Sequence, residues 1–126
     1  MNIYHPSKTP SPGEWLELDE LTRIDLVRKF HEASEAEFEE EQAKEVHSTI
    51  HVIVENQIAL GVEPVPATIF RLMRQGLSRH ESIHAVGAVL SQDLFEMLKQ
   101  NKEHDIKKYR RRLDKLTAKR WNKGKW

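Results

Sequence analysis

The sequence predicts an all-α protein, a small helical bundle of four main helices plus one short helix. Apolar residues recur at steps of three and four along most of the chain, which is the spacing of one face of an α-helix. No stretch shows the alternation of apolar and polar residues that is typical of a half-buried strand. The five prolines fall within the first 13 residues or at positions 64 and 66, so none interrupts a predicted helix.

The chain of 126 residues has the length of one domain. We expect an extended proline-rich arm at residues 1–13, a helical bundle at residues 14–118 and a basic tail at residues 119–126. The first helix is predicted from about Trp15, with an inward stripe of Leu21, Ile24, Val27 and His31.

The next helices are predicted from their end signals. Ser34 and Glu37 have the spacing of a capping box and open the second helix, which runs to about Leu60 because Gly61 favours a helix end. Its second half is apolar nearly all round, which indicates a central position in the core.

A short third helix is expected at residues 66–75, and Ser78 with Glu81 forms a second capping box that opens the fourth helix. Gly87 lies inside this fourth helix, where glycine costs about 1 kcal/mol relative to alanine, so we expect close approach of another helix there. A fifth helix over residues 102–118 carries an apolar stripe of Ile106, Tyr109, Leu113 and Leu116.

Two histidine pairs, His47 with His51 and His80 with His84, are the main functional signal. Residues four apart lie on one face of a helix, so each pair can direct two imidazoles at one ion, and Glu55 continues the first row by one more turn. We predict that these four histidines bind one divalent metal ion between two helices, with Glu55 as a fifth ligand or behind the ligands.

The alternative is that these histidines lie wet and hydrogen-bonded at the rim of the bundle. A buried imidazole needs partners for a donor and an acceptor, at about 1–3 kcal/mol for each one missing, and a metal would satisfy several of these at once. His31 is an additional candidate, either as a further ligand or as a residue that hydrogen-bonds to one. The alternative is that His31 is an ordinary buried histidine.

Nitrogen and oxygen ligands suit zinc, iron, nickel or manganese. An open coordination position would give a metal-dependent hydrolase and a closed one a structural site, so the sequence does not decide whether the protein is an enzyme. Residues 80–84 also match the H-E-x-x-H motif of zinc peptidases, with Glu81 as a weak candidate general base. We disfavour a peptidase because no strand is predicted beside the motif, and because Glu81 has a capping role.

Charge is distributed unevenly although the net charge is zero. Residues 14–45 hold 12 acidic and 4 basic side chains, whereas residues 102–126 hold 11 basic and 3 acidic ones. The basic C-terminal helix could serve a nucleic-acid-binding or protein-binding adaptor. We favour docking of its apolar stripe on the bundle, with the acidic residues 35–45 as partners in the same chain or across a homodimer.

Composition restricts the compartment and the chemistry. The absence of cysteine excludes disulfides, thiolate ligands and a cysteine nucleophile. No apolar run approaches the roughly 20 residues that cross a bilayer, and the first residues lack the apolar segment of a signal peptide. We therefore expect a soluble, cytoplasmic protein without a membrane partner.

Several runs of this sequence are similar to a known family. They are residues 14–20 followed by Arg23, Ile24, Phe30 and His31; residues 47–57; residues 71–73; residues 76–85; and residues 116–118 with Trp121. These runs resemble a family of short bacterial proteins known only as a domain of unknown function. The resemblance implies a small all-helical protein, with His31, His47, His51, Glu55, His80 and His84 as positions of interest. The family pattern leads us to expect tyrosine before His31, where this chain has Phe30.

Overall fold

The computed structural model describes residues 1–35 and 41–125, and the side chains of residues 1–33 and 45–125. All regular secondary structure in these residues is helical, which confirms the predicted all-α class. The helices are α1 (Pro12–Glu17), α2 (Glu20–Glu35), α3 (Glu41–Ala59), α4 (Val65–Arg74), α5 (Arg79–Gln100), α6 (Ile106–Lys115) and α7 (Ala118–Asn122).

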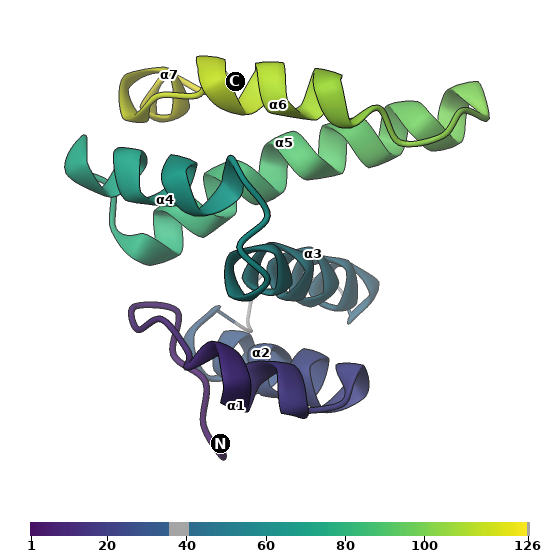
Figure 1. Ribbon diagram of the computed structural model, residues 1–126. Helices are drawn as coiled ribbons and strands as arrows, with labels where there is room; N and C mark the ends of the chain where they lie inside the picture. The colour runs from purple at the N-terminus through teal and green to yellow at the C-terminus, as the bar shows by residue number, and fades with distance from the viewer. Residues whose placement is uncertain (36–40, 126) are drawn as a thin grey trace.

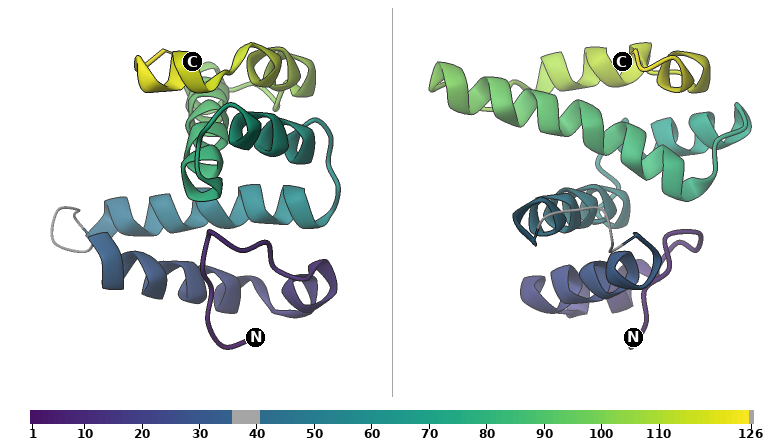
Figure 2. Two further views of the ribbon diagram at one scale, coloured as in Figure 1. Left: turned by 90° about the vertical axis from the view of Figure 1, so that its left-hand side faces the viewer. Right: turned by 180° about the vertical axis from the view of Figure 1, so that it is seen from behind.

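The helices stack in layers around α3 (Figure 1). Helices α1 and α2 contact one side of α3, α4 and α5 contact the other, and α6 lies on α4 and α5. Helix α5 crosses α3 steeply. In Figure 1, α3 is seen end-on and α5 lengthwise, and in the left view of Figure 2 the two are reversed. This steep crossing brings the N-terminal half of α5 across the middle of α3.

Two apolar clusters share α3. One contains Val54 together with residues of α4, α5 and α6, and the other contains Val52 together with Tyr4 from the N-terminal arm, Trp15 and Val27. Val52 and Val54 are both essentially inaccessible to solvent. The central position predicted for this helix from its all-round apolar character is therefore correct.

The first predicted helix is two helices in the structure. Helix α1 ends at Glu17, and the Asp19 carboxylate then accepts a hydrogen bond from the backbone N–H of Thr22 at 2.7 Å, which caps α2. Leu21 lies in the first turn of α2 and is 80% exposed, so its place in the inward stripe was wrong, while Val27 and His31 are buried as predicted. The Ser34–Glu37 capping box lies outside the residues whose side chains are described.

Helix α5 begins and packs as its sequence predicts. The Ser78 hydroxyl accepts a hydrogen bond from the backbone N–H of Glu81 at 3.0 Å. A Cβ atom added at Gly87 would lie 3.1 Å from Cγ2 of Ile50 on α3, closer than ordinary contact. The absence of a side chain at Gly87 therefore allows α3 and α5 to meet.

The C-terminal segment docks on the bundle through its apolar stripe. The helix predicted over residues 102–118 is shorter in the structure, where α6 begins only after its N-cap, Asp105, and ends at Lys115. Helix α5 ends at Gln100, and its C-cap, Asn101, has the left-handed conformation. Tyr109, Leu113 and Leu116 are at most 1% exposed, so α6 belongs to the core, whereas Ile106, the first residue of the predicted stripe, is 45% exposed.

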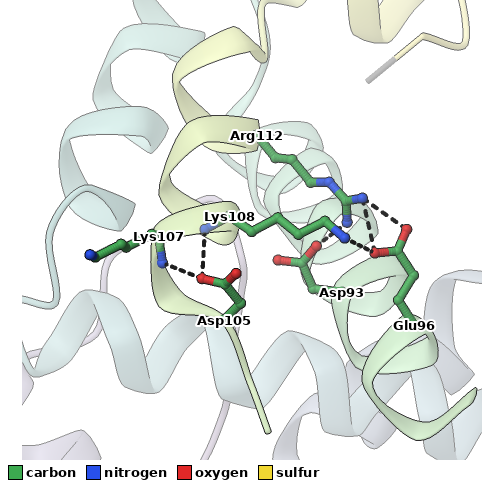
Figure 3. A network of polar contacts seen from close by, with 6 residues as sticks. All are labelled: Asp93, Glu96, Asp105, Lys107, Lys108 and Arg112. Carbon is green, nitrogen blue, oxygen red and sulfur yellow. Dashed lines mark hydrogen bonds and ion pairs between the residues drawn. The ribbon is translucent and has the colours of Figure 1, made fainter. Parts of the chain in front are cut away.

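The acidic partners of α6 lie on α5. The Arg112 guanidinium pairs with Asp93 and Glu96, and Lys108 Nζ lies 2.6 Å from Glu96 Oε2 (Figure 3). Within the part of the chain that is described, these carboxylates take the place that we expected residues 35–45 to fill. No described helix is both long enough and apolar enough to span a bilayer.

Candidate metal centre

Four histidines from three helices converge in the interior. One ring nitrogen from each of His31, His47, His51 and His84 lies within 4.8 Å of the corresponding nitrogen of the other three. Zinc bound to four nitrogens at about 2.0–2.1 Å would place these nitrogens about 3.3 Å apart. The more distant nitrogens of the group therefore need to approach by at most roughly 1.5 Å to hold such an ion.

The two layers on either side of α3 bring these histidines together. His47 and His51 occupy successive turns of α3, as their spacing predicted. The ring of His31 on α2 lies 4.4 Å from that of His47, measured between centroids. From the other side, Nε2 of His84 on α5 lies 3.1 Å from Nε2 of His47. The group thus depends on the packing of both α2 and α5 against α3.

Burial keeps two of these histidines neutral at ordinary pH. His51 is 2% exposed, and burial lowers its pKa to about 2, with a smaller contribution from the neighbouring histidines. For the same reasons the pKa of His84 falls to about 3. Neutral imidazole is the form that binds metals, so these two residues are ready to act as ligands at neutral pH.

His80 lies beside the four-histidine group. Its ring centroid is 4.1 Å from that of His84 and 5.6 Å from that of His51, yet it is not among the four residues whose nitrogens converge. His31, which the sequence suggested only as an additional ligand, takes that place. Whether His31 or His80 joins the converging group depends on how α2 packs against α3.

Glu55 is engaged by groups outside the histidine cluster. It is 1% exposed, and its two carboxylate oxygens accept hydrogen bonds from Nη1 and Nη2 of Arg79, each at 2.8 Å. The Tyr4 hydroxyl also donates to its Oε2. Both carboxylate oxygens of Glu55 are thus engaged by Arg79 or Tyr4, and Glu55 is not among the residues whose ligand atoms converge.

Tyr4 is a site residue that sequence reasoning missed. It is 2% exposed, and its hydroxyl oxygen lies 2.6 Å from Nε2 of His51. The arm was expected to be extended, and the only sequence signal for this contact was an aromatic residue among polar and proline neighbours. The ring of Phe30, at the position where the resemblance leads us to expect tyrosine, packs edge-on against that of Tyr4 with 6.5 Å between their centroids.

Glu81 lies apart from the histidine cluster. Its side chain is exposed, and its Oε2 accepts a hydrogen bond from the indole N–H of Trp121 at 2.7 Å. This contact replaces the reciprocal half of the predicted capping box. The glutamate of the H-E-x-x-H pattern therefore contacts α7, and nothing in its described contacts supports a general base.

Comparison of this chain with protein-family models, with curated proteins and with solved structures gives no match. The resemblance to a bacterial family of unknown function stays a prediction. Support for a metal site therefore comes from the geometry of the four histidines in this chain alone.

Proposed function

We propose that this protein binds one divalent metal ion through His31, His47, His51 and His84. The observation that carries the proposal is the convergence of four imidazole nitrogens from three helices. His51 is 2% exposed and its Nδ1 has no hydrogen-bond partner among the described residues, and burying such a polar group without coordination would be costly.

The ligand set favours particular metals. Imidazole nitrogen suits zinc, iron and nickel, whereas manganese prefers oxygen ligands. Because Glu55 is held by Arg79, the set contains no carboxylate, and manganese is the least favoured of the four metals considered. We take zinc as the probe.

The number of ligands favours a structural or metal-holding role over hydrolysis. Catalytic zinc sites generally have three protein ligands and a water molecule, whereas structural sites are filled by four protein ligands. In a four-histidine site, one imidazole would have to give up its position to water before a hydrolytic step.

Metal analysis of untagged protein tests the proposal. After equilibration with zinc and removal of free metal, we expect about one equivalent bound per chain. His31→Ala and His84→Ala should each remove most of it, because each takes away one of four ligands. His80→Ala should have the smaller effect, and His104→Ala, which changes an exposed histidine, should have none.

Two results would overturn this proposal. One is wild-type protein that retains less than about a tenth of an equivalent of zinc, iron or nickel. The other is a double variant, His31→Ala with His84→Ala, that binds as much metal as wild type.

A further inference from the structure

A buried polar network lies directly behind His51. Arg79 and Glu55 form a two-pronged ion pair in which both side chains are at most 4% exposed. Arg79 Nη1 also donates to the backbone oxygen of Pro6 at 2.9 Å, which fastens the N-terminal arm to α5. Tyr4, two residues earlier in that arm, places its hydroxyl between Glu55 and His51.

Counting protons in this network determines the direction of each hydrogen bond. In its ion pair with Arg79, the Glu55 carboxylate can only accept, so the single proton of the Tyr4 hydroxyl goes to Glu55. A phenol keeps its proton at neutral pH, because the ordinary pKa of tyrosine is about 10. The Tyr4 oxygen can then only accept from Nε2 of His51, and Nε2 must carry a hydrogen.

The other nitrogen of His51 is thereby left with a lone pair. A neutral imidazole carries one proton, and in His51 that proton is on Nε2. Nδ1 is buried and has no hydrogen-bond partner among the described residues. An unpaired buried acceptor is costly, and a metal ion in the histidine group would satisfy it.

We propose that Tyr4, supported by Glu55 and Arg79, is a positioning residue that fixes His51 in the Nε2–H tautomer and so presents Nδ1 to the metal. This inference rests on the proposed metal binding for its purpose, although the tautomer itself does not require a metal. Ligating histidines commonly donate their other N–H to an oxygen that orients the ring. Here the oxygen belongs to a tyrosine of the N-terminal arm, so the arm is part of the site.

The tautomer can be measured in the unmodified chain. Long-range proton–nitrogen NMR spectra of full-length, metal-free protein labelled with ¹⁵N at histidine distinguish Nδ1–H from Nε2–H rings, and His51→Gln assigns the signal. We expect His51 to be the Nε2–H form at neutral pH. An Nδ1–H form, or a rapid exchange between the two forms, would overturn the proposal.

The contribution of Tyr4 to metal binding is tested by removing only its hydroxyl. Tyr4→Phe should weaken zinc binding by about 10–100-fold, measured by competition with a chelator. Tyr109→Phe is the matched control, because that buried hydroxyl donates to Gln57 at 2.9 Å on the other side of α3, and its loss should leave zinc affinity unchanged. Equal zinc affinity in Tyr4→Phe and wild type would refute the positioning role.

The two proposals fail in different ways. If wild-type protein binds no zinc, the proposed function is wrong, and the NMR measurement still decides the tautomer. If wild-type protein binds zinc while His51 is the Nδ1–H form before loading, metal binding stands and the role of Tyr4 falls.

Discussion

At the scale of single residues, Arg79 is what allows a carboxylate to lie in this interior. Removing one partner of a buried ion pair leaves an uncompensated charge, which typically costs about 3–5 kcal/mol. We therefore expect Arg79→Ala to lower the free energy of unfolding by about that amount, measured by urea denaturation. Arg28→Ala is the control, because Arg28 pairs with Asp25 at the surface and its loss should cost at most about 1 kcal/mol. Similar stability losses in the two variants would contradict the importance we assign to the buried pair.

The residues of the site were only partly predictable. Spacing placed His47 beside His51 because the geometry of one helix is local. It favoured His80 over His31, whereas the structure groups His31 with the others, because which of the two joins the group depends on how α2 and α5 rotate against α3. Tyr4 was beyond reach for a similar reason: its partners His51 and Glu55 lie 47 and 51 residues away in sequence.

At the scale of helices, the contact of Gly87 with Ile50 sets the separation of α3 and α5. A side chain at Gly87 would meet Ile50 on the facing helix, so we expect Gly87→Val to destabilise the fold by about 1–3 kcal/mol through overpacking. Zinc affinity should fall as well, because the histidine ligands come from both helices. Thermal melting and chelator competition measure the two effects.

A second valine on the same helix separates packing from helix propensity. Ser91 on α5 is exposed, so Ser91→Val carries only the small propensity cost of a β-branched residue and should leave zinc binding intact. If Gly87→Val behaves like Ser91→Val, the close approach of α3 and α5 does not matter for the site.

The helix boundaries agree with the predicted ones where the sequence has a capping residue or a proline. Ser78 opened α5, and the prolines at 64 and 66 marked the start of α4, because capping and proline act within one turn. The predictions were wrong between α1 and α2, where a helix is broken without proline or glycine, and at the start of α6, which begins at Ile106 and not at about residue 102. There the breaks depend on side chains such as Asp19 and Asp105 that cap the following helix.

At the scale of the whole molecule, stability of the metal-free chain should fall in mild acid. The ordinary histidine pKa is 6.5, whereas in the fold His51 and His84 have values of about 2 and about 3. Below pH 6.5 the unfolded chain binds protons that the folded chain does not, so the stabilisation is complete above that pH and is lost as the pH falls toward 3. Each group alone contributes about 1.4 kcal/mol per pH unit inside this window.

Urea denaturation in the presence of a chelator, at several values between about pH 7 and pH 5, tests this expectation above the range in which carboxylates titrate. Bound zinc should be released over the same interval, because protons compete for the same nitrogens. A free energy of unfolding that is flat over this interval would contradict the expectation.

The dispersal of the four histidines over α2, α3 and α5 has a consequence for biosynthesis. While the chain is still on the ribosome and has not yet exposed His84, it offers at most three of the imidazoles, and α5 is not there to bring the last one in. If the chain binds zinc as proposed, tight binding therefore follows translation of α5, and we expect a fragment that stops at the end of α4 not to retain zinc. In the cell, bound metal would then be found on chains in which α5 has been translated and not on shorter nascent chains.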